Sequence, residues 1–201
     1  MSRRPRRTIE QHRDHLVAVA EQLFYDRGLH AVGVDQVAAA ADVAPTTLYR
    51  AFASKDELVT AYVERRDEAW RRWWRDAVEP HADPAAALCA VFAAAAEQVA
   101  AHGYRGCPFL MGLAEYPDPA HPAHRAAVAN KRWARRELGS LCAGAVDDAA
   151  AADRLADQLM VVLDGVYASA QDLGPGGPAA GAAELAGSLI SAAQLAGATR
   201  S

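Results

Sequence analysis

Residues 34–58 constrain the fold of this chain more than any other segment. Their apolar side chains follow the spacing of helices with one buried face, interrupted at a single point. Asp42 stands at the interruption and tolerates a left-handed backbone conformation. Pro45 suits the first position of a second helix, because a proline there loses no hydrogen bond. Ser54 and Glu57 then form a capping-box pattern. The segment predicts two short helices joined by a turn, with a capped third helix after them.

The second of these short helices, residues 45–52, has an apolar back and a polar front. At about 100° per residue, Leu48 and Phe52 point to the same side, and Arg50 points to the opposite side. Such a helix can dock on a domain and present its polar face to the major groove of DNA. The alternative is an ordinary helical hairpin whose polar face is merely solvated.

Five side chains in and after this helix are candidate DNA contacts. Arginine binds guanine with two hydrogen bonds, and threonine bonds a base edge or touches a thymine methyl group. A tyrosine at the edge of the face and a lysine at a helix N-terminus are better placed for phosphates. The predicted base contacts are Arg50, Thr46 and Thr47, and the predicted phosphate contacts are Tyr49 and Lys55.

Residues 9–62 resemble the DNA-binding domain of the TetR family of bacterial transcriptional repressors. The matching pieces are Leu23-Phe24 with Gly28, Val34-Asp35-Gln36-Val37-Ala38, Leu48-Tyr49-Arg50-Ala51-Phe52 and Ser54-Lys55-Asp56-Glu57-Leu58. The chain departs from the family pattern at four positions. Gly33 stands where the family usually has Thr or Ser, and Asp42 where it usually has Gly. Ala44 stands where Ser is usual, and Ala51 where His is usual. The departures at Gly33 and Ala51 remove two side chains that could contact phosphates. The resemblance implies a sequence-specific DNA-binding transcriptional regulator, and not an enzyme.

The rest of the chain predicts helices throughout, so the expected fold class is all-α with about nine helices. The longest of the early helices, from residue 55 to about residue 78, would span about 36 Å. That length can join a three-helix head to a helical body. We therefore expect a DNA-binding domain over residues 1–54 and an effector-binding and dimerisation domain over residues 55–201. Further helices are expected near residues 84–103, 107–115, 123–143, 152–172 and 179–196, and residues 174–178 are expected not to be helical.

The composition fits a small cytoplasmic protein. The chain has 201 residues, of which 52% are hydrophobic, and this is ample for a core. Neither a membrane span nor the apolar core of a signal peptide is found in the sequence. Cys89, Cys107 and Cys142 have no paired or zinc-like spacing. We expect free thiols, no metal and no cofactor.

Positive charge is concentrated at the N-terminus. Residues 1–75 hold 13 Lys or Arg and 11 Asp or Glu, whereas the whole chain has a net charge of −4. Four arginines lie in the short arm from Arg3 to Arg7, which could follow the DNA backbone or enter the minor groove. A solvated tail is the alternative. We expect that removing residues 1–7 weakens operator binding and flattens its salt dependence. An unchanged salt slope, measured by titration of labelled DNA, would contradict a role for the arm.

The last two helices indicate a partner. Apolar residues line one strip of each helix: Leu155, Leu159, Val162, Val166 and Ala170, then Leu185, Leu189, Ile190, Ala192 and Ala193. These strips could instead face the protein's own core. A two-helix recognition unit reads few bases, and dimers on palindromic half-sites overcome that limit. The TetR resemblance also implies a homodimer that pairs the helix from Ala152 to Asp172 with the helix from Ala179 to Ala196.

The body between head and dimer interface is where the resemblance implies a small-molecule effector pocket. A mostly apolar set with a few polar groups is typical of such sites. The candidates are Cys107, Phe109, Met111, Tyr116, Trp133, Asp164 and Tyr167, and for each the alternative is a core position. Trp70, Trp73 and Trp74 could line the pocket or pack between head and body. We expect repression by operator occupancy, with release when an effector displaces the long helix.

Three other functions are alternatives to this interpretation. An enzyme is disfavoured because the sequence has no phosphate loop, nucleophile motif or metal-spaced cluster. A redox-sensing repressor would use Cys107, whose place before Pro108 near a helix start could lower its pKa. A DNA-binding architectural protein without a ligand would bind tightly and without sequence preference.

Overall fold

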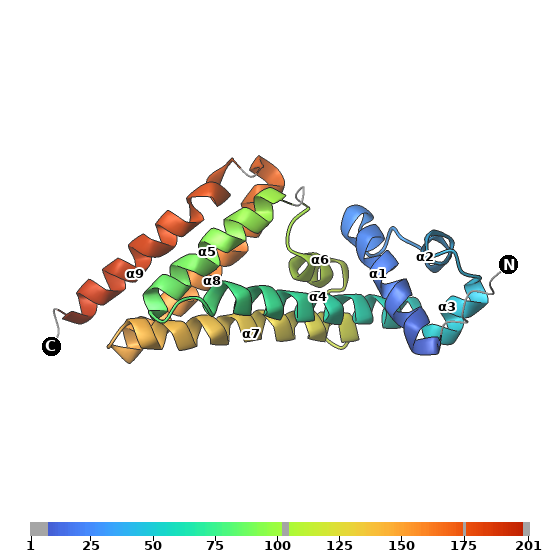
Figure 1. Cartoon of the computed structure of the whole chain (residues 1–201), viewed down its shortest axis with the longest axis horizontal. Coiled ribbons are helices and arrows are strands. Elements are labelled where there is room, and N and C mark those ends of the chain that lie inside the picture. The colour runs from blue at the N-terminus through green and yellow to red at the C-terminus, as the bar shows by residue number, and fades with distance from the viewer. Residues whose placement is uncertain (1–7, 102–104, 175, 199–201) are drawn as a thin grey trace. The chain divides into compact units, whose positions relative to one another are not determined.

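The computed structural model describes residues 8–101, 105–174 and 176–198. These residues contain nine α-helices and one 3-10 helix and no strand, which confirms the all-α prediction (Figure 1). The arm from Arg3 to Arg7 lies outside the described residues. In chain order the helices are α1 (Ile9–Arg27), α2 (Val34–Ala40), α3 (Pro45–Ala51), α4 (Lys55–Val78), α5 (Pro84–Ala101), α6 (Pro108–Glu115), α7 (Pro122–Ala145), α8 (Ala149–Leu173), η1 (Pro178–Gly181) and α9 (Ala182–Ala198).

The chain forms two compact units. The first contains residues 1–68 and 108–128, and the second contains residues 69–107 and 129–201. Helices α4 and α7 therefore contribute residues to both units. The first unit holds more than the three-helix head, since it also includes the start of α4 and all of α6.

Capping residues set the helix ends of the first unit. Thr8 and Gln11 form a capping box at the start of α1. The helix ends at Gly28, whose φ of 94° is a conformation that side chains other than glycine rarely adopt. The turn between α2 and α3 contains Asp42 at φ 53°, the left-handed conformation that the sequence predicts. Helices α1, α2 and α3 pack on one another, and Phe24 and Tyr62 meet edge-to-face in their core.

The helices of the second unit were predicted correctly in number but not in every boundary. Helix α8 begins at Ala149 and not near residue 152, because Asp148 caps the N–H groups of Ala150 and Ala151. Residues 174–178 were predicted not to be helical. This was wrong at the last residue, since Pro178 opens the 3-10 helix η1. Helix α9 accordingly starts at Ala182 instead of residue 179.

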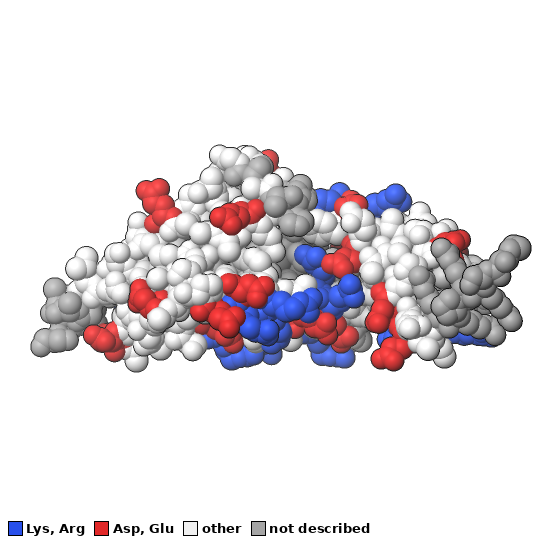
Figure 2. All heavy atoms as spheres, in the orientation of Figure 1, with Lys and Arg blue, Asp and Glu red and all other residues white. Residues whose placement is uncertain are grey.

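Helices α5, α8 and α9 pack against one another and form much of the core of the second unit. Leu155, Leu159 and Val166 of α8 are buried in this core. The sequence left two roles open for their stripe, and the structure selects the core. The exposed face of α8 carries Val161, which lies outside the predicted strip. On α9 Leu185 of the predicted strip is exposed, whereas Ile190 is buried. Figure 2 shows few charged side chains over the α5 and α9 side of this unit, and Glu184 is the one charged residue of α9.

None of the helices in the described part of the chain is long and apolar enough to cross a bilayer.

Candidate functional site

Helix α3 presents the polar face that the helical wheel predicts. Thr46, Tyr49 and Arg50 are exposed, and 54% of the surface of Tyr49 is accessible. Behind them Leu48 and Phe52 are each only 1% exposed. Because its back is fully buried, α3 is held on the domain with its polar face outward. Thr47 is half-buried and lies at the edge of that face.

The predicted phosphate ligand Lys55 is already engaged within the first unit. Its Nζ donates a hydrogen bond to the carbonyl oxygen of His30 at 3.0 Å. The side chain is therefore held against the turn that follows α1. An ammonium group has three N–H donors, so this bond does not prevent Lys55 from reaching a phosphate.

Two helix starts near α3 lack a capping side chain. The N-caps of α2 and α3 are Gly33 and Ala44, and neither makes a side-chain cap bond. At α2 the side chain of Gln36 compensates, since its Oε1 accepts the N–H of Gly33 at 2.9 Å. The starts of α2 and α3 therefore present no hydroxyl group at their N-cap positions.

Arg13 of α1 fixes the end of α3 against the start of α4, a role that no pattern in the sequence predicts. Its Nη1 donates to Glu57 Oε1 at 2.7 Å and also to the carbonyl oxygen of Ala51. The guanidinium carbon lies 4.2 Å from the centroid of the Phe52 ring. The hydrogen bond from Arg13, followed by that from the N–H of Ala53, lowers the pKa of Glu57. The exposed face of α3 is thus held at a defined place.

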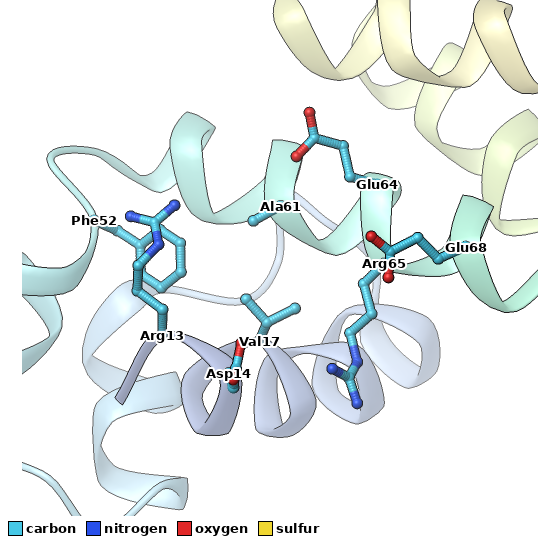
Figure 3. A pocket seen from close by; sticks show the side chains of 8 residues that line it. All are labelled: Arg13, Asp14, Val17, Phe52, Ala61, Glu64, Arg65 and Glu68. Carbon is cyan, nitrogen blue, oxygen red and sulfur yellow. The ribbon is translucent and has the colours of Figure 1, made fainter. Parts of the chain in front are cut away.

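Next to Arg13, a shallow hollow of about 180 Å³ lies between α1 and α4 (Figure 3). Its walls carry both signs of charge, and Arg65 also pairs with Glu21 at 3.2 Å. Charges of opposite sign at such short range offset one another, so the hollow favours neither anions nor cations strongly. Its lining residues are Arg13, Asp14, Val17, Phe52, Ala61, Glu64, Arg65 and Glu68.

The last residue of α6 closes the turn between α1 and α2. The two carboxylate oxygens of Glu115 accept the N–H groups of Leu29 at 2.9 Å and His30 at 2.6 Å. His30 Nε2 also lies 2.6 Å from the carbonyl oxygen of Glu115. A Cβ on Gly28 would approach Glu115 Oε1 to 3.3 Å, so glycine also makes room for the carboxylate. We call this arrangement the Glu115 clamp.

Glu115→Ala is expected to destabilise the protein by about 1–3 kcal/mol, because two backbone N–H groups lose a charged acceptor. Urea unfolding followed by circular dichroism measures this loss. Glu79→Ala is a matched control, because Glu79 is exposed beyond the end of α4. Equal unfolding midpoints for the two variants would contradict a structural role for the clamp.

Tyr116 follows the clamp and is buried between two imidazole rings. Its ring centroid lies 4.6 Å from that of His30 and 4.3 Å from that of His121. Both faces of the predicted pocket residue are therefore covered within the first unit. Burial, and then the nearby carboxylates of Asp56 and Glu115, raise the pKa of Tyr116 to about 12.

This raised pKa predicts a difference in alkaline stability. The unfolded phenol ionises near its ordinary pKa of 10.0, and the folded phenol near 12. The contribution of Tyr116 to stability is therefore complete below pH 10 and is lost as the pH rises from about 10 to about 12. Tyr116→Phe should make the decline of the free energy of unfolding over this range shallower. Parallel declines for the two proteins in urea titrations would show that Tyr116 ionises as it does in the unfolded chain.

The remaining pocket candidates divide between the two units. Phe109 and Met111 belong to α6 in the first unit, where Phe109 is 1% exposed and Met111 is half-buried. The other four belong to the second unit. Two of them, Cys107 and Asp164, are brought together by Lys131, which the sequence did not mark as a candidate. Lys131 Nζ lies 2.5 Å from Asp164 Oδ1 and 3.5 Å from Cys107 Sγ.

The other two candidates in the second unit join an aromatic group. Tyr167 donates its hydroxyl proton to Gln98 Oε1 at 2.6 Å, and its ring meets Trp70 at 5.5 Å between centroids. Trp133 meets Trp74 at 5.6 Å. One signal could have revealed the polar part of this region: Asn130, 1% exposed, interrupts the apolar register of α7 immediately before Lys131.

Cys107 is 4% exposed, and this burial is typical of a structural cysteine. The redox alternative is therefore not supported. Burial raises the pKa of Cys142 to about 11, and that of Cys89 is raised as well. Within the described ranges, no group of three or more His, Cys, Asp or Glu side chains is arranged to hold a metal ion.

The chain has a three-helix head in which α3, the second helix of the α2–α3 pair, faces outward, and a helical body follows it. This arrangement defines the class of helix-turn-helix regulators. Residues 16–62 match the family model of bacterial regulatory proteins of the tetR family. The transcriptional activator FasR of Mycolicibacterium smegmatis is 41% identical over 56 residues, and the match spans 28% of this chain and 26% of FasR. This chain therefore matches only about a quarter of the length of that relative.

Two solved structures are similar over nearly the whole chain. A TetR-family transcriptional regulator from Streptomyces coelicolor shares 31% identity with a TM-score of 0.82, over 92% of this chain and 95% of that one. A TetR-type regulator from Streptomyces avermitilis shares 30% identity with a TM-score of 0.75, over 90% and 97% respectively. The chain belongs to the TetR family of bacterial transcriptional regulators, which confirms the family predicted from residues 9–62.

Proposed function

We propose that the protein is a repressor that binds a palindromic operator as a homodimer and is released by a small-molecule effector. In this proposal residues 1–54 bind DNA, and residues 55–201 bind the effector and form the dimer. The observation that carries the DNA-binding part is the outward polar face of α3 over a fully buried back. An exposed helix face held rigidly in this way fits the major groove.

Each exposed side chain of this face has a DNA group that it can recognise. Arg50 reads guanine, Thr46 and Thr47 read a base edge or a thymine methyl group, and Tyr49 and Lys55 bind phosphates. The Arg13 contacts with Glu57 and Ala51 support the assignment, because they fix α3 before DNA arrives. A contact surface that is already ordered loses less conformational entropy on binding.

Selection of bound sequences from random DNA tests this function directly. We expect the purified protein to enrich a palindrome whose half-sites are about one helical turn or more apart, because each half-site receives one copy of α3. Enrichment without symmetry would contradict the dimer, and no enrichment at all would contradict sequence-specific binding.

For the dimer we propose the exposed faces of α8 and α9 as the surface that binds a second copy. Val161, Gly165 and Ala168 are exposed and recur along one side of α8, and Leu185 and Ala192 do the same on α9. Val161 is 73% exposed and Leu185 50% exposed, so a second copy that covers them buries apolar surface. The small residues between them allow close helix approach. The predicted pairing of the last two helices is kept. On α9 the face is the predicted one, since Leu185 and Ala192 belong to the predicted strip, whereas on α8 it differs from the predicted strip.

For the effector we propose the second-unit part of the predicted pocket, namely Cys107, Trp133, Asp164 and Tyr167 together with Lys131. The support is that α4, α5, α7 and α8 bring polar and aromatic side chains together here. An effector that binds better when α4 is displaced shifts the protein towards that conformation. In a dimer this changes the spacing of the two heads and releases DNA.

Repression by occupancy is tested with a promoter that carries the selected operator. We expect transcription in a purified system to fall as the protein is added. FasR carries the name of an activator, and its similarity extends over only 56 residues, so the direction of regulation needs its own measurement. A rise in transcription would overturn repression while leaving operator binding intact.

A further inference from the structure

All four tryptophans of the chain lie in one cluster in the second unit. Ring centroids are 4.6 Å apart for Trp70 and Trp73, 6.4 Å for Trp73 and Trp74, and 5.6 Å for Trp74 and Trp133. The ring of Tyr167 extends the series at 5.5 Å from Trp70. Three of the indoles come from α4 at positions i, i+3 and i+4, which place them on one face of that helix.

This cluster is only partly covered. Trp74 and Tyr167 are 4% and 5% exposed, whereas Trp70, Trp73 and Trp133 are half-buried. Aromatic rings are stabilised by offset-stacked or edge-to-face contact with another aromatic ring, beyond the area that is buried. Three partly open indoles in contact with their neighbours therefore form a surface suited to an aromatic ligand more than to a flexible aliphatic chain.

Polar groups adjoin this aromatic surface. Asp164 is three residues before Tyr167 on α8, so the two share a side of that helix. Lys131 pairs with Asp164 at 2.5 Å, and the two side chains are 18% and 34% exposed. A lysine ammonium has three N–H groups, and Lys131 donates to Asp164 and Cys107. The third can donate to a ligand oxygen, and the carboxylate can accept from a ligand hydroxyl.

The charges near the cluster select against two other ligand classes. The guanidinium carbon of Arg71 lies 4.6 Å from the centroid of Trp133, so a protein cation already occupies one ring face. An organic cation gains little, because the Arg71 guanidinium already covers that ring face and Lys131 offsets the charge of Asp164. An anion gains little either, because Asp164 offsets Lys131 at 2.5 Å. These groups therefore favour a neutral ligand over a charged one.

We propose that the effector is an uncharged planar aromatic molecule that carries a hydroxyl and a carbonyl group, such as a hydroxylated aromatic ketone. Its rings stack on Trp70 and Trp73, and its oxygens bond Lys131 and Asp164. This inference rests on the proposed effector response of the second unit. It adds the chemical class of the ligand and the groups that recognise it.

The test uses the intrinsic fluorescence of the full-length protein, because every tryptophan lies in the cluster. 3-Hydroxyflavone is the probe, and flavone, ethidium and decanoate serve as its hydroxyl-free, cationic and aliphatic anionic counterparts. We expect 3-hydroxyflavone to quench the emission with an affinity about tenfold higher than that of flavone, which lacks one hydrogen bond. Tighter binding of ethidium or decanoate, or no quenching by 3-hydroxyflavone up to about 100 μM, would overturn the proposal.

Variants locate the binding. Trp73→Ala should weaken 3-hydroxyflavone at least about tenfold, and Trp73→Phe should restore most of the affinity. The double variant Lys131→Met with Asp164→Asn avoids an unpaired charge and should remove the preference for 3-hydroxyflavone over flavone. Arg132→Met is its control, because Arg132 is exposed next to Lys131 on α7. A preference that survives in the double variant, with its melting temperature unchanged, would overturn the assignment of these two residues.

A separate measurement distinguishes this inference from the proposed function. Release of labelled operator DNA is followed as 3-hydroxyflavone is added. Binding at the cluster without DNA release would uphold the ligand class and overturn the effector response. DNA release by decanoate, with no quenching by 3-hydroxyflavone, would uphold the effector response and overturn the ligand class.

Discussion

Val161→Glu is expected to convert the dimer to a monomer and to abolish tight operator binding. In a two-fold symmetric interface one substitution places a carboxylate on each copy. Burying two carboxylates without partners raises the dimer Kd by about 100-fold or more. A monomer reads one half-site, so operator affinity falls with it. Light scattering and DNA titration measure the two losses.

The same substitution should leave the protein folded, since Val161 is 73% exposed in the single chain. Ala143→Glu adds an equal charge at an exposed position of α7 and is the matched control. A Val161→Glu protein that remains dimeric would place the interface on another face. A monomer that still binds the full operator with unchanged affinity would show that dimerisation does not contribute to recognition.

Arg50→Ala is expected to weaken operator binding by about 2–6 kcal/mol. A bidentate contact between arginine and guanine contributes about 1–3 kcal/mol of discrimination, and a palindrome is read twice. The loss should be confined to operators with the preferred base, so sequence selection with the variant should lose one position in each half-site.

Arg72→Ala is the control for charge, because Arg72 is exposed on α4 in the second unit. It should leave the operator affinity within a few tenths of a kcal/mol of the unchanged protein. If Arg50→Ala weakened all DNA sequences equally, Arg50 would be a phosphate ligand instead of a base reader.

Local signals account for what the sequence predicts well. Thr8, Ser54 and Pro84 begin helices where their side chains satisfy or avoid orphan N–H groups, and α4 has the predicted bounds. The back and front of α3 also follow from a period of 3.6 residues. The start of α8 was missed because the alanines after Asp148 give no periodic apolar signal.

Contacts between distant residues account for what the sequence could not predict. Arg13 meets Glu57 across 44 positions, and Lys131 meets Asp164 across 33 positions. Periodicity assigns each side chain to a helix face, but not to the opposite helix that it touches. For the same reason the apolar stripe of α8 could be a core or an interface, and only the packing of α5, α8 and α9 distinguishes the two.

The Glu115 clamp bears on how regulators of this kind can be recombined. Glu115 bonds the N–H groups of Leu29 and His30 across more than 80 positions of chain. A reading head cut out at residue 54 would lose this acceptor and would also lose Lys55, which donates to the carbonyl oxygen of His30 in the same turn. A functional transplant of the head onto another sensor body must therefore carry α6 or an equivalent carboxylate. The turn between α1 and α2 is in this sense encoded by two separate stretches of the gene.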